Sequence, residues 1–329
     1  MQGRACVVAA AVVAALNLVS CVPRPKPPVL PSAPPVAGAT IWREPTDMST
    51  RDLYYGAWGP RRAPDPNAVY TFVERKHSGV NPGMTVVDPE GREWSVKQPF
   101  PGGSEDEGPV EVALSRVLSA IGYHQPPVHY LSTFTLKDDW GTHTEVGGRF
   151  RLKEESLKEL GPWRWEDNPF VGSRPYQGLL VILMMFNSTD LKDSNNSIYE
   201  RRDGGRAEQW YVVRDIGSGL GDTNRFAPHK NHPDAFERHP FILGVGRHVD
   251  LAHDGWYGPL VRDRISPDDV VWASRLLARL SDRQWQDAFR AGSYQPEVAN
   301  RFIRKLREKV RQGQEVTARE PRRADSRGR

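Results

Sequence analysis

Polar side chains that could handle phosphate groups flank one predicted β-hairpin. Asp190, Asp193, Asn195 and Asn196 share a loop before it, and Asp215 follows it in an Asp-Ile-Gly tripeptide. Carboxylate and amide oxygens suit Mg²⁺, which is usually held by few protein groups together with phosphate oxygens. A carboxylate in the same loop could orient or deprotonate an incoming hydroxyl. The pattern predicts a site for a divalent metal and a triphosphate.

A buried helix and a hairpin are expected to position this loop. Residues 178–186 are apolar on every side, as in a buried helix. Residues 197–201 and 209–214 alternate around an Asp-Gly-Gly turn and predict the hairpin. The charge-rich residues 153–159 are expected to form a solvated helical face. Three amphipathic helices are predicted to follow, at 267–280, 282–291 and 296–311.

The first half contributes a lysine and a glutamate. Residues 84–88 and 92–98 alternate around an Asp-Pro-Glu-Gly turn, which predicts a hairpin with Lys97 near the end of its second strand. Residues 110–121 predict an amphipathic helix, with Glu111 at the edge of its apolar face. A carboxylate at that edge could reach an ammonium group.

This order of residues and elements resembles the protein-kinase-like fold over residues 69–312. The residues that carry the resemblance are Asp190-Leu191-Lys192 with Asn195 for D-L-K-x-x-N, Asp215-Ile216-Gly217 for D-F-G, Trp94-Ser95-Val96-Lys97 for V-A-I-K, and Glu111 for the helix glutamate. The resemblance implies an α+β, two-lobed fold with a small β-rich N-lobe that contains one helix, and a helical C-lobe.

The chain also departs from ordinary protein kinases. Ser188-Thr189 stand where His-Arg would be, and no A-P-E follows Gly217. The loop that would cover the nucleotide offers only Gly79 and Gly83. The pattern is more similar to atypical kinase-like families, such as the bacterial toxin kinases and phosphoinositide kinases.

The resemblance implies ATP and Mg²⁺ as cofactors and assigns roles to the matched residues. Lys97, oriented by Glu111, would contact the phosphates, with Gly79 and Gly83 in the covering loop. Asp190, or its rival Asp193, would act on the acceptor hydroxyl. The metal ligands would be Asp215 and either Asn195 or Asn196.

The N-terminus predicts export. Arg4 precedes an apolar run over residues 5–18, and Leu18-Val19-Ser20-Cys21 resembles the lipobox of bacterial lipoproteins. Residues 1–20 are therefore expected to be a cleaved signal peptide, with acyl chains on Cys21 anchoring the protein in the membrane. The proline-rich residues 21–40 would form a tether. The predicted location is the bacterial cell envelope, at the outer membrane, facing the periplasm or the cell surface.

Composition bounds the remaining classes. The chain has 329 residues, 38% of them hydrophobic, and a net charge of +4. A mean hydropathy of −0.60 excludes a multi-span membrane protein, and the balanced charge argues against a nucleic-acid partner. We expect an N-lobe at 41–136, a C-lobe at 137–312 and a disordered tail at 313–329.

Two functions fit this pattern. The first is a membrane-anchored, exported kinase that uses ATP and Mg²⁺ to phosphorylate an unknown protein, sugar or lipid acceptor in the envelope or outside the cell. The alternative is a catalytically inactive kinase-like scaffold that binds partners at the envelope, where ATP is scarce. A structural lipoprotein of unrelated fold would instead place Lys97 and Asp215 far apart.

Overall fold

The computed structural model of the chain describes residues 38–76, 82–99, 106–203, 205–226 and 228–316. The predicted signal peptide, Cys21, most of the tether, Gly79 and most of the predicted tail lie outside the described residues. Within the described residues, no helix is both long and apolar enough to cross a membrane.

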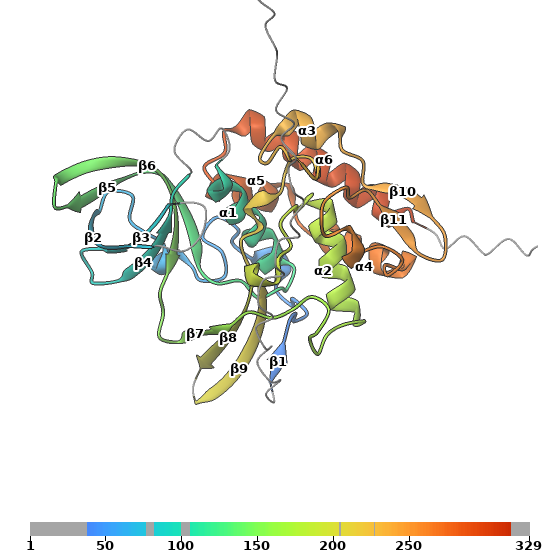
Figure 1. Ribbon diagram of the computed structural model, residues 1–329, viewed down its shortest axis with the longest axis horizontal. Coiled ribbons are helices and arrows are strands. Elements are labelled where there is room, and N and C mark those ends of the chain that lie inside the picture. The colour runs from blue at the N-terminus through green and yellow to red at the C-terminus, as the bar shows by residue number, and fades with distance from the viewer. Residues whose placement is uncertain (1–37, 77–81, 100–105, 204, 227, 317–329) are drawn as a thin grey trace, which may run out of the picture. The chain divides into compact units, whose positions relative to one another are not determined.

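Five strands close into a barrel in the first half of the chain (Figure 1). They are β2 Val69–Lys76, β3 Gly83–Val87, β4 Glu93–Lys97, β5 Val128–Asp138 and β6 Gly141–Leu152, in the spatial order β2-β3-β4-β6-β5. The β3–β4 hairpin confirms the pattern around the Asp-Pro-Glu-Gly turn. Alternate side chains such as Trp94, Val96 and Phe150 fill the interior and are fully buried, so their sequence neighbours point out of the barrel.

The barrel continues past residue 136, which corrects the predicted end of the N-lobe. β6 pairs with β5 along a hairpin from Val128↔Arg151 to Asp138↔Gly141, and with β4 from Trp94↔Leu152 to Lys97↔Arg149. A boundary at 136 would cut this hairpin, because strands far apart in sequence close the barrel. The β-rich part therefore extends to Leu152.

The predicted amphipathic helix is α1, Glu107–Ala120, which begins three residues earlier than expected. The Asp106 side chain accepts a hydrogen bond from Gly108 N and caps its N-terminus. Gly122 follows with φ +103°, and a Cβ there would lie 2.2 Å from the Arg43 carbonyl oxygen, so only glycine fits. The early start adds Glu107 to the first turn of α1.

A four-stranded sheet lies below α1 in Figure 1, in the order β1-β9-β8-β7. Its strands are β1 Ala39–Thr40, β7 Leu157–Gly161, β8 Asn196–Asp203 and β9 Arg206–Val213. The β8–β9 hairpin was predicted. The expectation of a helical face at 153–159 is wrong, because Leu157 pairs with Arg201 of β8 and is buried beside Tyr199.

The rest of the chain is mainly helical, as predicted. The elements are α2 Arg174–Met185, α3 Pro233–Arg238, β10 Ile242–Val245, β11 Val249–Leu251, α4 Pro267–Ala278, α5 Asp282–Ala291 and α6 Pro296–Gln314. Short 3₁₀ turns occur at Met48–Thr50, Pro60–Arg62, Asp193–Asn195, Ile216–Ser218 and Gly258–Leu260. The apolar helix α2 is buried and contacts α4 and α6.

The last helix extends beyond residue 313, where the disordered tail was predicted to begin. α6 runs to Gln314, and Gly313 lies so close to Ser274 that a Cβ would meet its Oγ at 2.0 Å. Val316 is 8% exposed and belongs to the main hydrophobic core. The α+β class, with a β-rich N-terminal region and a helical C-terminal region, is confirmed.

Candidate active site

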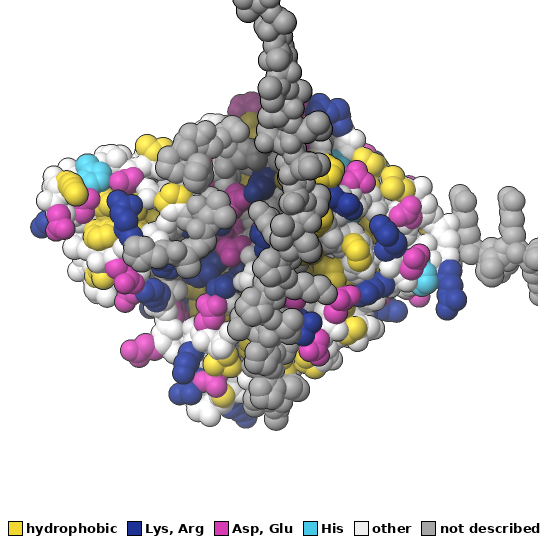
Figure 2. Space-filling view, viewed as in Figure 1, with side chains coloured by type: hydrophobic (Ala, Val, Ile, Leu, Met, Phe, Trp, Pro, Cys, Tyr) yellow, Lys and Arg dark blue, Asp and Glu magenta, His cyan; other side chains and the backbone are white. Residues whose placement is uncertain are grey.

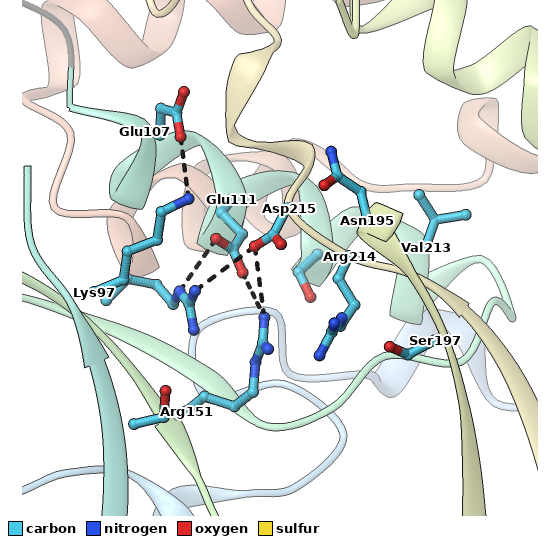
Figure 3. A network of polar contacts seen from close by, with 12 residues as sticks. Lys97, Glu107, Glu111, Arg151, Asn195, Ser197, Val213, Arg214 and Asp215 are labelled. Atoms are coloured by element: carbon cyan, nitrogen blue, oxygen red, sulfur yellow. Dashed lines mark hydrogen bonds and ion pairs between the residues drawn. The ribbon is translucent and has the colours of Figure 1, made fainter. Parts of the chain in front are cut away.

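Charged side chains from the barrel, α1 and the end of β9 meet in one place, which we call the junction cluster (Figure 3). Its members are Lys97 on β4, Glu107 and Glu111 on α1, Arg149 and Arg151 on β6, and Asp215 after β9. Figure 2 shows acidic and basic side chains interleaved between the barrel and the helical part. Residues from β4, α1, β6 and the end of β9 therefore share one polar site.

Strand register places the three cations together. Lys97 is paired with Arg149, and Ser95 with Arg151, across β4 and β6. Directly opposed residues project from the same face of a sheet. Because Trp94, Val96 and Phe150 point into the barrel, Lys97 and both arginines point outward, toward α1.

Lys97 forms its ion pair with Glu107, at 3.1 Å between Nζ and Oε2, and not with Glu111 as predicted. Lys230 also contacts Glu107, at 2.7 Å. The reason is the earlier start of α1, which brings a glutamate one turn upstream of Glu111 within reach. Burial opposes the charged form of Lys97, but the charges of Glu111, Asp215 and Glu107 outweigh it and raise the pKa of the lysine.

Glu111 instead faces the two arginines of β6. Its carboxylate lies 3.1 Å from Arg149 Nε and 3.0 Å from Arg151 Nη2, and its side chain is only 4% exposed. Removing the Glu111 carboxylate, or the arginines that face it, would leave a buried charge without a partner. Glu111 therefore links β6 to α1 through ion pairs. It does not contact Lys97, but its negative charge helps to raise the pKa of that lysine.

Asp215 completes the cluster from the helical part. It lies 3.7 Å from Arg149 Nη2 and 4.0 Å from Arg151 Nη2, and its backbone is left-handed, with φ 49°. Burial opposes the carboxylate, but Arg151, Arg149 and Lys97 outweigh it and lower the pKa of Asp215 to about 2. The side chain is therefore ionised near neutral pH.

The loop before β8 brings Asp190 and Asn195 to the same junction. Asn195 Nδ2 donates to the Asp190 carbonyl oxygen at 2.7 Å, and Arg214 N donates to the Asn195 carbonyl at 3.0 Å. Asn195 is thus fixed beside the residue that precedes Asp215. The Asp190 carboxylate is 34% exposed and pairs with Lys192 at 2.8 Å.

Asp193 and Asn196 are turned toward two buried tryptophans. Asp193 Oδ1 accepts a hydrogen bond from Trp165 N at 3.0 Å, and Asn196 Nδ2 donates to the Trp163 carbonyl at 3.2 Å. Asn196 is fully buried. These contacts give both residues a structural role, so Asp190 and Asn195 are the better placed of each pair of candidates. Gly83 begins β3 directly opposite Lys97.

The donor set fits Mg²⁺ with two protein ligands. Asp215 supplies an ionised carboxylate that is 30% exposed. The amide nitrogen of Asn195 donates to the Asp190 carbonyl oxygen, so the amide oxygen is the atom of this side chain that could bind a metal. In the described part of the chain, no three His, Cys, Asp or Glu side chains are grouped to hold a metal by themselves. The remaining ligands would be water and phosphate oxygens, as is usual for Mg²⁺.

Four charged residues of this region were missed from sequence: Glu107, Arg149, Arg151 and Arg214. One signal was available, because Arg149-Phe150-Arg151 alternates as a strand with one buried face would. The sequence alone did not reveal that this strand would pair with β4.

A polar cavity of about 470 Å³ lies apart from the junction cluster, between the N-terminal segment, α1 and the β8–β9 hairpin. Trp58, Trp210 and several arginines line it. Three of those arginines already pair with carboxylates: Arg43 with Glu208, Arg51 with Asp47 and Arg62 with Glu154. Its charges are thus largely matched within the protein, so we do not assign a site there.

Comparisons with known proteins give only distant similarities. No protein-family model matches the chain, and no curated protein matches it. Similar solved structures include the Helicobacter pylori proinflammatory kinase CtkA, at 10% identity and TM-score 0.34, covering 75% of this chain and 98% of that one. The Rio2 kinase of Chaetomium thermophilum, solved as an ADP/Mg²⁺-phosphoaspartate complex, gives 12% identity and TM-score 0.34, covering 76% and 73%.

A third similar structure is hydra Fam20 with sugar, at 12% identity and TM-score 0.35, covering 75% of this chain and 85% of that one. All these structures are similar to the chain at TM-scores that do not establish a shared fold. The functional assignment therefore depends on the geometry of the junction cluster.

Proposed function

We propose that this protein is an exported kinase-like phosphotransferase that uses ATP and Mg²⁺. The observation that carries the proposal is the convergence of Lys97, Asn195 and Asp215, from the barrel and the helical part, on one junction. The order of these residues is the order that the protein-kinase-like resemblance implies. Phosphoryl transfer depends mainly on positioning and charge neutralisation, which such a cluster can supply.

Each residue has a role in this proposal. Lys97, held by Glu107, binds phosphate oxygens of the donor. Asp215 and Asn195 would hold Mg²⁺, which would neutralise charge on the transferred phosphoryl group. Asp190, on the exposed side of the loop, positions the acceptor hydroxyl.

The envelope setting is part of the proposal and is supported by the sequence. The lipobox-like residues 18–21 support a lipid anchor on Cys21, and the following proline-rich stretch supports a tether. The acceptor would then be a protein, sugar or lipid in the bacterial envelope or outside the cell.

A second candidate function is a binding module without catalysis. It is favoured by the ion pairs of Arg149 and Arg151 with both Glu111 and Asp215. In this arrangement Asp215 is already neutralised by the protein's own arginines. A module of this kind would bind a partner or an anion and transfer nothing.

Thermal unfolding of the full chain in detergent, with and without Mg²⁺-ATP, tests the proposal. At about a hundredfold excess over Kd, a ligand adds about 2.7 kcal/mol of stability. We expect this gain for the parent protein and for the exposed control Asp203→Ala, and its loss in Asp215→Ala. No gain in the parent protein would contradict nucleotide binding. Transfer of labelled phosphate to an envelope extract would support the phosphotransferase, and binding without transfer would support the module.

A further inference from the structure

The outward face of the barrel beside Lys97 is polar. Two cross-strand rows follow from the register of β2, β3, β4 and β6: Lys76, Gly83, Lys97 and Arg149 form one, and Glu74, Thr85, Ser95 and Arg151 form the other. Lys153 adds a further cation at the end of β6, where its backbone N bonds to Glu93 O. Across these described rows, every side chain is charged or a hydroxyl, apart from the glycine.

The hydroxyls in these rows are covered by ammonium groups. Lys76 Nζ donates to Ser95 Oγ, and Lys153 Nζ lies 3.4 Å from Thr85 Oγ1. Burial, and then the neighbouring cations Lys153, Arg149 and Arg151, lower the pKa of Lys76 to about 8. The cations of this face therefore repel one another, and an anionic ligand would relieve that repulsion.

On the side of the four-stranded sheet, Tyr199 and Glu159 interact electrostatically with Arg151, and Figure 3 draws Arg214 and Ser197 in the same region. Arg214 Nη1 pairs with Glu159 at 2.8 Å, and Ser197 Oγ donates to the same carboxylate at 2.8 Å. Two apolar side chains of the same sheet pack inside a hydrophobic cluster: Val212 is fully buried and Leu157 is 8% exposed. Among the described residues of these strands, Val73 of β2 and Leu160 of β7 are exposed. The side chains of the two cross-strand rows and those that contact Glu159 are polar.

Several buried donors at the junction also lack acceptors. Among the described residues, Arg149 Nη1, Arg151 Nε and Arg214 Nε have no hydrogen-bond partner. The Arg149 side chain is only 5% exposed. Buried N–H groups are normally satisfied, and arginine matches phosphate oxygens particularly well. These donors therefore point to a ligand rich in anionic oxygens.

We propose that the junction site recognises its ligand through a chain of phosphate groups and does not select for a base. Different nucleoside triphosphates, and inorganic tripolyphosphate, bind with similar affinity. The inference rests on the proposed function in that it assigns triphosphates to the same site. Its physical reason is that ligand pockets take apolar groups on apolar linings, whereas here the cations supply the binding energy.

Isothermal titration of the full chain in detergent, with Mg²⁺ present, tests this inference. The ligands are ATP, GTP, UTP, inorganic tripolyphosphate and adenosine. We expect Kd values within about threefold for the four triphosphates, since each tenfold difference requires about 1.4 kcal/mol, and no binding of adenosine. ATP bound more than about tenfold tighter than tripolyphosphate would overturn the inference and leave the proposed function standing. Failure of all four triphosphates to bind would overturn both.

Substitutions test whether the triphosphates bind at the junction site. Arg151→Gln should weaken ATP and tripolyphosphate by the same factor, about tenfold for one lost charge-assisted contact. The exposed Lys153→Gln should do the same more weakly, and it keeps the test open if Arg151→Gln does not fold. Lys158→Gln, on the exposed side of β7, is the matched control and should change nothing. A loss confined to ATP in either site variant would place the base on this face and contradict the inference.

Discussion

Glu107 and Glu111 lie one helical turn apart on α1 and serve different cations. Glu107 is 20% exposed and pairs with two lysines, whereas Glu111 is 4% exposed and contacts two arginines of β6. Exposed pairs contribute little to stability because solvent screens them. Breaking a buried pair is costly because a charge is left without a partner.

These two environments predict different effects of the same substitution. Glu111→Gln should lower the free energy of unfolding by about 3 kcal/mol, because Arg149 and Arg151 lose their shared buried carboxylate. Glu107→Gln, the matched control, should cost about 1 kcal/mol. Urea unfolding at neutral pH measures both values. Equal losses would contradict the assignment of Glu111 as the buried partner.

Buried histidines predict acid sensitivity. Burial, and then the neighbouring Arg116, lower the pKa of His129 to about 2, while burial and Arg43 lower that of His124 to about 3. Arg116 Nη2 donates to His129 Nδ1 at 3.1 Å, since a guanidinium has no acceptor, so this nitrogen is unprotonated.

The sign of the pH effect follows from linkage. Below about pH 6.5 the unfolded chain binds a proton at each histidine and the native state does not, so acid favours unfolding. For His129 the loss should reach about 2 kcal/mol at pH 5. Urea unfolding between pH 7 and pH 5 measures it, and His129→Gln should reduce the slope. An unchanged slope in this variant would contradict the buried, neutral state.

The packing of α2 against α4 requires glycine at position 178, where a side chain would collide with Trp272. A Cβ there would lie 2.2 Å from Cζ3 of Trp272 on α4. Only glycine allows α2 to approach the indole this closely, and overpacking of this kind typically costs 1–3 kcal/mol. The contact helps to place α2, which leads directly into the loop of Asp190 and Asn195.

Gly178→Ala should therefore destabilise the protein by about 1–2 kcal/mol, although alanine favours a helix over glycine by about 1 kcal/mol. In a Trp272→Ala background, the same substitution should be neutral or stabilising, because the clash is gone. A double-mutant cycle measured by chemical denaturation compares the two backgrounds. Equal effects in both would show that Trp272 does not limit the site.

At the scale of the whole molecule, the segment before the barrel ties α1 to α5. Arg51 Nη1 donates to the carbonyls of Ser119 and Ala120 at the end of α1, at 2.8 and 3.0 Å. Gln284 of α5 donates to the carbonyl oxygens of Met48 and Arg51, at 2.7 and 3.1 Å. The Arg51 bonds satisfy carbonyl groups at the C-terminal end of α1.

A truncated chain tests the importance of this segment. Residues 38–316 should unfold in one cooperative transition, because they contain the described core. Residues 69–316 should lose that cooperativity, because α1 loses its terminal partners and the core loses Ile41, Met48 and Leu53. Circular dichroism melting compares the two. Equal melting temperatures for the two chains would mean that residues 38–68 do not contribute to the stability of the fold.

Most elements could be predicted because their signals are local. The hairpin that ends near Lys97, the apolar helix α2 and the terminal helices follow from residue periodicity, turn residues and caps. The strand β7 and the full extent of the barrel could not be predicted, because partners distant in sequence determine them. For the same reason, the N-lobe boundary at 136 was too early.

The sequence by itself determined the types and order of the reactive groups: Lys97, then Asp190, Asn195 and Asp215. Only the tertiary structure decided which neighbours they meet. In the folded protein Lys97 pairs with Glu107, and Arg149 and Arg151 join the site. Asp193 and Asn196 instead form hydrogen bonds with the backbone of two tryptophans. The physical reason is that periodicity fixes the face on which a side chain lies, whereas its charge partner depends on strand pairing and helix packing over long separations.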